Sequence, residues 1–259
     1  MSNAVFVMPF VATTPGLPTV APGDLVPYAD YETSALEHWV FGGDSTSLVG
    51  LVNGRQLTPQ SSMPSFSSVS LTLPGQGEAL ISDIDDTHAR TFFAVVRRPV
   101  QGAQSDRGVY WGNRGFSASF PHDGGIIAQA NFFSVSAGGS VNTVYSDING
   151  SSRSTSSLTY NNAGVDVGDW AFILVSESID GFIVQINSTQ APGSATVERA
   201  LAPVPYALGN AYYNNPDWKS LSLEFDEWGC VDGTADSAEA TALYNRAKAR
   251  CARRGITVA

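Results

Sequence analysis

The segment from residue 170 to residue 187 constrains the fold most, because two strongly apolar stretches flank a short polar turn. Residues 170–178 read WAFILVSES and residues 182–187 read FIVQIN, with Asp180 and Gly181 between them. Asp-Gly between alternating apolar segments is a strong signal for a β-hairpin. In the first stretch apolar side chains occupy both odd and even positions, so both faces of the strand are apolar. The pattern predicts a central strand covered on both sides, as in a two-sheet sandwich.

The rest of the chain continues in short strand-like runs separated by turn residues. Apolar or alternating runs, with Gly, Pro and Asn between them, occur around residues 36–41, 48–52, 69–73, 91–98 and 221–228. Only 15% of the residues are charged, which suits a sheet-rich surface of hydroxyls and amides. These features predict an all-β fold, a two-sheet antiparallel jelly-roll sandwich within a domain of residues 31–259.

The two ends of the chain differ from this pattern. Residues 1–30 contain five of the 14 prolines, which block regular structure. We expect an extended arm there, lying on the domain or on a neighbouring subunit. Near the C-terminus, Asp236 and Glu239 form a capping-box arrangement, and Gly255 supplies a stop signal. The apolar spacing between these signals predicts one α-helix over residues 236–254.

Charge and hydropathy argue against several classes of partner. The formal net charge is −10, so a nucleic acid would be repelled. The sequence has no run of about 18 apolar residues, so no membrane insertion is expected. The first ten residues lack the basic region and the long apolar run of a secretory signal, so we expect no signal peptide. We expect Cys230 and Cys251 to be reduced and buried, although a bridge between them stays open.

Several motifs together resemble a known superfamily. The sequence FDEWGC, which begins at Phe225, carries an Asp-Glu pair and leads into a helix with Ala-Leu-Tyr at residues 242–244. Residues 36–58 and the hairpin at residues 178–187 add to the similarity. Over residues 34–259 the chain therefore resembles the laminin-G-like branch of the concanavalin A-like lectin/glucanase superfamily. This resemblance implies a jelly-roll fold.

The sequence KARCARRGITV near the C-terminus and the MSN start also resemble lectin-like modules of bacteriophage structural proteins. Such modules occur in tails, baseplates and capsid-attached fibres. The resemblance implies a virion component made in the host cytoplasm. It also implies a homo-oligomer, with a trimer favoured, and contacts with other virion proteins through the N-terminal arm.

Acidic residues on the strand before the helix raise an enzymatic alternative. Glucanases of the superfamily use a Glu-x-Asp-x-x-Glu strand motif, and Glu224-x-Asp226 matches its first half. The third acid would fall at Gly229, so the acid/base partner is missing unless Glu227 substitutes across a β-bulge. We expect Asp226 and Glu227 to be a structural pair, with glycoside hydrolysis as the alternative.

Two acidic turns are candidates for a hard cation. Asp83 and Asp85, with Asp86 beside them, form one candidate, and Asp147 with Asn149 forms the second. Neither has the ligand spacing of an EF-hand loop, and Asp and Asn in turns usually bond to their own backbone. The sequence predicts no cofactor, with Ca²⁺ as the alternative.

Three predicted loops combine aromatic rings with polar side chains. Aromatic faces match the apolar C–H faces of sugars, and side-chain amides pair with sugar hydroxyls. The candidate carbohydrate-binding residues are Tyr212, Tyr213, Asn214, Asn215, Trp218, Tyr160, Asn161 and Trp111. The alternative is that these aromatics belong to the core at strand ends or contact a neighbouring subunit. For the loop at residues 212–218 both interpretations stay open, and for the others the core interpretation is preferred.

These observations favour a non-catalytic bacteriophage virion protein of the tail-fibre or baseplate type. Its lectin-like module would serve attachment to host-surface glycans or particle assembly. The alternatives are a polysaccharide-cleaving glycoside hydrolase of the same fold and a purely structural virion subunit such as a capsid decoration protein.

Overall fold

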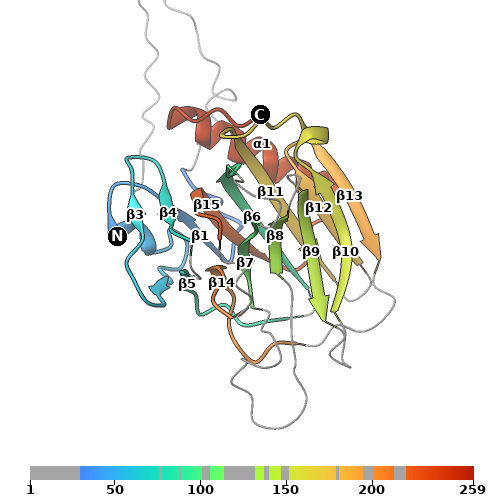
Figure 1. Ribbon diagram of the computed structural model, residues 1–259, viewed down its shortest axis with the longest axis horizontal. Helices are drawn as coiled ribbons and strands as arrows, with labels where there is room; N and C mark the ends of the chain where they lie inside the picture. Colours follow the sequence, from blue (N-terminus) through green and yellow to red (C-terminus); the bar gives the residue numbers. More distant parts are fainter. Residues whose placement is uncertain are drawn as a thin grey trace, which may run out of the picture.

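A computed structural model of the protein describes residues 30–75, 78–87, 89–100, 106–113, 132–136, 140–146, 152–178, 181–194, 201–212 and 220–259. The expected arm, residues 1–30, lies outside the described residues except for its last residue. The described chain forms two antiparallel sheets and one α-helix near the C-terminus (Figure 1). The predicted sandwich with a C-terminal helix is therefore confirmed. No helix in this part of the chain is long and apolar enough to cross a bilayer.

The first sheet has eight strands, in the order β13-β12-β11-β6-β15-β4-β3 with β1 paired to β15. Its strands are β1 (Glu37–Val40), β3 (Ser65–Phe66), β4 (Leu71–Leu73), β6 (Arg90–Arg97), β11 (Trp170–Glu177), β12 (Gly181–Ile186), β13 (Thr189–Ser194) and β15 (Leu223–Asp232). One edge of β15 pairs with β6, and its other edge pairs first with β4 and then with β1. The predicted hairpin is the pair β11–β12. Strand β11 also pairs with β6 toward the middle of the sheet, and β12 also pairs with the edge strand β13.

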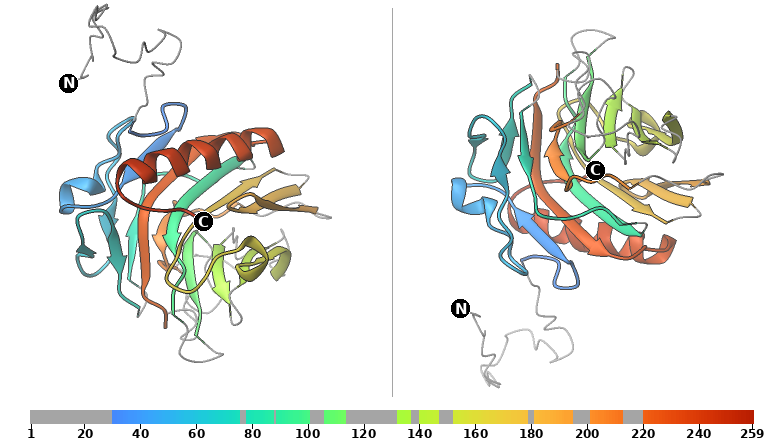
Figure 2. Two further views of the ribbon diagram at one scale, coloured as in Figure 1. Left: turned by 90° about the horizontal axis from the view of Figure 1, so that it is seen from above. Right: turned by 90° about the horizontal axis from the view of Figure 1, so that it is seen from below.

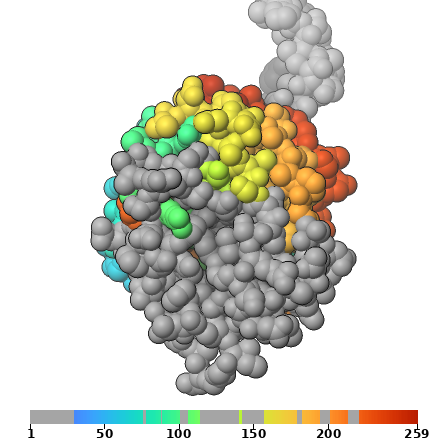
Figure 3. All heavy atoms as spheres, turned by 45° about the vertical axis from the view of Figure 1, so that its right-hand side comes forward, coloured from blue at the N-terminus to red at the C-terminus, as the bar shows by residue number. Residues whose placement is uncertain are grey.

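The second sheet has seven strands, in the order β10-β9-β8-β7-β14-β5-β2. Its strands are β2 (Thr58–Pro59), β5 (Ala79–Ile81), β7 (Gly108–Gly112), β8 (Phe132–Ser136), β9 (Ser140–Ser146), β10 (Ser152–Thr159) and β14 (Ala207–Gly209). Two 3-10 helices, η2 (Ser45–Leu48) and η3 (Asn161–Ala163), lie in connections. Strand β10 contacts β12 and β13 of the first sheet. On the face shown in Figure 3, the yellow surface of residues 157–178 lies beside the orange surface of residues 182–193.

Aromatic side chains fill the space between the two sheets. The rings of Trp39 and Trp228 stack with centroids 5.0 Å apart, and Phe92 stacks on Trp228 at 5.8 Å. Because side chains alternate along a strand, Phe92 faces this core while Phe93 faces the opposite side of the first sheet.

The outer face of the first sheet is covered by α1 (Ser237–Arg253), which lies across the middle of the sheet (Figure 2). The helix begins as predicted, because Asp236 caps it and accepts a hydrogen bond from the backbone N–H of Glu239 at 2.8 Å. On its buried side Tyr244 packs against Phe172 of β11, with ring centroids 5.7 Å apart. Strand β11 is apolar on both faces because the core covers one and the helix covers the other.

The two cysteines lie on opposite faces of the first sheet. Cys230 belongs to the core between the sheets, and Cys251 lies on the side of α1 that packs on the outer face of the sheet. Both are free and buried, as expected.

Candidate functional site

Two consecutive acids of β15 point to the same side of the first sheet. The pairing of β15 with β6 shifts register between Phe225 and Glu227, which marks a β-bulge. Phe225 and Trp228 both face the core between the sheets, and so Asp226 and Glu227 both lie on the side that α1 covers. Neither acid is more than 1% exposed, so each needs a partner beneath the helix.

Glu227 is held by a guanidinium and an imidazole. Arg250 of α1 donates from Nε and Nη2 to its two carboxylate oxygens, at 3.0 and 2.9 Å. His38 Nε2 lies 3.3 Å from Glu227. Because His38 Nδ1 accepts the backbone N–H of Glu32 at 2.8 Å, the neutral ring carries its proton on Nε2. Burial opposes ionisation, but Arg250 and His38 together hold the pKa of Glu227 below its ordinary value.

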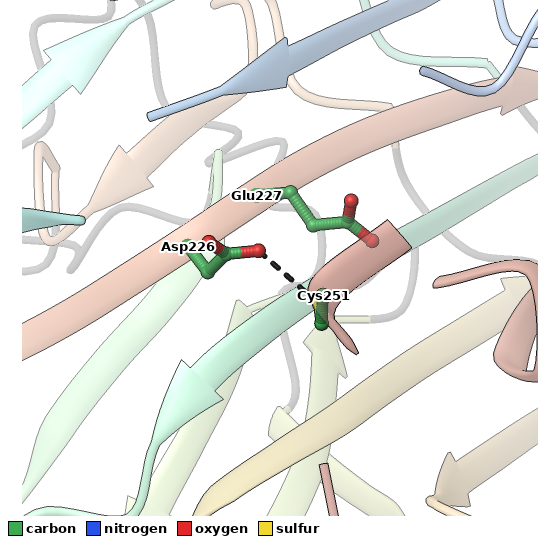
Figure 4. A group of neighbouring side chains, drawn as sticks. All are labelled: Asp226, Glu227 and Cys251. Carbon is green, nitrogen blue, oxygen red and sulfur yellow. Dashed lines mark hydrogen bonds between the residues drawn. The ribbon is translucent and has the colours of Figure 1, made fainter. Parts of the chain in front are cut away.

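Asp226 has a different environment from its neighbour, although the two carboxylates approach each other (Figure 4). Its Oδ1 lies 2.6 Å from Nη1 of Arg254, and the Cys251 thiol donates to its Oδ2 at 3.2 Å. Burial, followed by the charge of Glu227, raises the pKa of Asp226 well above its ordinary value. Burial also raises the pKa of the Cys251 thiol, so its sulfur stays protonated.

Within the described chain, Asp226, Glu227 and Cys251 are the one group of three whose ligand atoms lie close enough together, within 4.8 Å, to surround a metal ion. A metal would have to displace Arg250 and Arg254 from the two carboxylates and deprotonate a buried thiol. We therefore assign this group a structural role, as a buried ion-pair network that fastens α1 to β15.

Glu224 and Asp226, which match the first half of the glucanase motif, do not face each other across a shared open site. The Glu224 side chain is 25% exposed, whereas Asp226 is buried beneath α1. The β-bulge that could let Glu227 replace the missing acid exists, but it turns this residue toward Arg250. No third acid fits at Gly229, because a Cβ there would lie 2.2 Å from Cζ of Phe93. This geometry does not place two carboxylates on either side of a glycosidic bond.

A polar cleft of about 400 Å³ lies where β6 ends and β15 begins. It is lined by Thr72, Arg97, Arg98, Pro99, Val100, Asp106, Gly168, Ser220, Leu221, Ser222 and Glu224. Thr72 of β4 pairs with Glu224 of β15, which in turn lies beside Arg97 of β6. Three neighbouring strands thus present a hydroxyl, a carboxylate and a guanidinium in one row.

Three contacts hold the guanidinium of Arg97. Its Nε donates to the carbonyl oxygen of Gly168 at 2.7 Å, and its Nη1 lies 3.3 Å from Oε2 of Glu224. Its guanidinium also lies over the ring of Trp170, 5.8 Å from the centroid. The other carboxylate oxygen of Glu224 accepts a hydrogen bond from the hydroxyl of Ser70 at 2.7 Å. These contacts fix the orientation of both charged groups in the cleft.

Arg98 is anchored by neutral groups. Its Nη1 donates to Oδ1 of Asn161 at 3.0 Å and also to the carbonyl oxygen of Val165. Its guanidinium lies 5.2 Å from the ring centroid of Tyr160. The backbone N–H of Arg98 donates to the carbonyl oxygen of Asp169 at 2.8 Å, which pins the end of the strand.

The structure contradicts two of the predicted carbohydrate-binding residues. Trp111 and Tyr160 are 0% exposed and belong to the core, so neither ring can stack on a sugar. The Tyr160 hydroxyl bonds to that of Tyr110, and burial raises the pKa of Tyr160. Asn161 is exposed and holds Arg98 at the cleft, while Tyr212 is half-buried, with a pKa that burial raises to about 12. The other predicted residues, Tyr213, Asn214, Asn215 and Trp218, lie outside the described residues.

The acidic turn at residues 83–86 does not form a cation site of three ligands in the described chain. Asp83 lies 2.8 Å from Nη1 of Arg55. Asp86 accepts hydrogen bonds from the backbone N–H of Ala202 at 2.8 Å and the hydroxyl of Tyr206 at 2.9 Å. Asp85 is exposed. The second candidate pair, Asp147 and Asn149, lies outside the described residues.

The cleft leaves no continuous pattern in the sequence, because its lining comes from segments that are far apart in the chain. Thr72, Arg97, Gly168 and Glu224 meet only through the pairing of β4, β15, β6 and β11. One local signal was present, since the apolar strand before Pro99 ends in two adjacent arginines although only 15% of the residues are charged.

The described elements define the class of this protein as a jelly-roll β-sandwich with a helix on one outer face. No protein-family model matches the sequence, and no curated protein matches it either. Its structure is similar to the ligand-binding domain of botulinum neurotoxin serotype D in complex with N-acetylneuraminic acid, with a TM-score of 0.58 and 9% identity over 83% of this chain and 51% of that chain. The receptor-binding domain of botulinum neurotoxin type G is similar too, with a TM-score of 0.57 and 10% identity over 83% of this chain and 52% of that chain. At these identities the likeness establishes the fold, and the chain spans about half the length of these neurotoxin domains.

Proposed function

We propose that this protein is a non-catalytic glycan-binding module and that the polar cleft is its contact site for sugar. The observation that carries the proposal is the row of Thr72, Glu224 and Arg97 across three strands. A saccharide presents hydroxyls that both donate and accept, so it needs fixed acceptors and donors side by side. The cleft also has a volume in the range of small-molecule sites, about 300–1,000 Å³.

The fold comparison supports this proposal at the level of architecture. One neurotoxin domain with the same kind of sandwich is described in complex with N-acetylneuraminic acid, which is a sugar. The non-catalytic part of the proposal rests on the separation of Glu224 from the buried Asp226 and on the clash that excludes an acid at position 229.

The proposed setting is a bacteriophage virion, in a tail fibre or baseplate, where the module would attach to host-surface glycans or take part in particle assembly. The resemblance of the sequence to lectin-like phage modules supports this setting. The N-terminal arm would contact other virion proteins, and the protein would assemble as a homo-oligomer, with a trimer favoured.

A glycan-array screen of the purified protein, with and without EDTA, tests the proposal. Glu224→Gln removes the charged acceptor from the row of Thr72, Glu224 and Arg97, and we expect it to weaken binding at least fivefold. Arg253→Gln changes an arginine of α1 that does not line the cleft and should bind as the parent protein does. Glycan binding that both variants retain in full would show that the cleft is not the site. No binding to any glycan, together with a stable oligomer in solution, would favour a purely structural subunit.

A further inference from the structure

The two arginines of the cleft differ in their electrostatic balance. Arg97 has a carboxylate partner, since its Nη1 lies 3.3 Å from Glu224. The side-chain partners of Arg98 are the amide oxygen of Asn161, the carbonyl oxygen of Val165 and the ring of Tyr160. Across the described part of the chain, Arg98 therefore makes no ion pair. Arg98 is thus a positive charge at the cleft without a carboxylate partner, in a chain whose net charge is −10.

The contacts of Arg98 leave one edge of its guanidinium for a ligand. Both hydrogen bonds of the side chain come from Nη1, to Asn161 and Val165. A guanidinium has five N–H donors, so the Nε–Nη2 edge keeps its donors in a parallel pair. The ring of Tyr160 and the pinned backbone hold this edge in place. A donor pair that is ordered before binding loses little entropy when a ligand arrives.

We infer that the cleft takes a saccharide that carries a carboxylate, and that Arg98 binds this carboxylate with two parallel hydrogen bonds. Two parallel N–H donors match the two oxygens of a carboxylate. Glu224 also lines the cleft, where Arg97 balances its charge, so it can accept hydrogen bonds from the sugar hydroxyls while Arg98 takes the carboxylate. The inference rests on the proposed glycan-binding function and names the class of sugar.

Matched ligand pairs test this inference on the unmodified protein. Titration calorimetry would compare oligogalacturonate with its methyl ester and sialyllactose with its methyl ester, in about 150 mM salt where general charge effects are screened. We expect at least one acid to bind at least tenfold more tightly than its ester. Because the chain is acidic overall, non-specific attraction cannot produce this preference. Sulfated lactose is the third ligand. If it bound more tightly than either carboxylate, the inferred ligand would be a sulfate ester and the carboxylate inference would be overturned.

Variants assign the preference to Arg98. Arg98→Gln should remove the difference between acid and ester, whereas Arg253→Gln should leave it unchanged. Equal binding of acid and ester by the parent protein would overturn the inference while the proposed glycan-binding function stands. An array on which no glycan binds would overturn both. Because the comparison of acid with ester needs no variant, a folding defect of Arg98→Gln cannot hide the result.

Discussion

Replacing Arg250 by methionine tests whether the buried ion-pair network holds α1 on the sheet. The side chains of Arg250 and Glu227 are 5% and 1% exposed, and two hydrogen bonds join them. Methionine keeps a long, helix-compatible side chain but leaves the carboxylate of Glu227 without its main cation. Removing one partner of a buried pair costs about 3–5 kcal/mol. For a domain of this size each kcal/mol lowers Tm by about 2–4 °C, so we expect a decrease of roughly 6–20 °C.

The free energy of unfolding would be measured by urea titration at pH 7, with tryptophan fluorescence as the signal. Arg253→Met is the matched control, because Arg253 is 36% exposed and lies 3.5 Å from Asp30, which is 89% exposed. An exposed pair of this kind contributes less than about 1 kcal/mol. The double variant Arg250→Met/Glu227→Gln removes the unpaired charge and should recover most of the loss. If Arg250→Met were no more destabilising than Arg253→Met, the reasoning about the buried network would be refuted.

The pH dependence of this variant gives a second check. Without Arg250, burial is the main influence left on Glu227 and raises the pKa of this carboxyl in the folded state. The folded variant then binds a proton more readily than the unfolded chain does. Its stability relative to the parent protein should therefore recover as the pH falls below neutrality.

Three further predictions concern single positions. Because burial raises the pKa of Asp226 above its ordinary 3.8, the unfolded chain loses this proton first, so the Asp226 contribution to stability should fall as the pH rises from about 4. Asp226→Asn should remove this decline in urea titrations at pH 4 to 7.5, and an unchanged slope would contradict the assignment. Gly229→Ala places a Cβ against the buried ring of Phe93 and should cost about 1–3 kcal/mol in thermal unfolding; an unchanged Tm would show that the ring can move aside. Burial raises the pKa of both Cys230 and Cys251, so neither thiol should react with Ellman's reagent until the protein unfolds. Fast reaction of the native protein would contradict their burial.

The candidate site was only partly predictable from the sequence. Tyr160 and Trp111 have the side chains of a sugar site, but their rings are fully buried in the core. An aromatic residue near a strand end has the same sequence pattern whether its ring points into the core or out of it. Asn161 does lie on the surface, where it holds Arg98.

The sequence by itself determined the central strand and the helix, because both signals are contained within a few adjacent residues. Apolar side chains on both faces of residues 170–175 require a cover on each side, and Asp236 with the apolar spacing after it specifies the helix. Only the tertiary structure decided that α1 supplies one of these covers. It alone also placed Asp226 and Glu227 on one face, through a bulge, and brought Arg97 beside Glu224. Strand register and bulges depend on partners more than 100 residues away in the chain, and local periodicity carries no information about them.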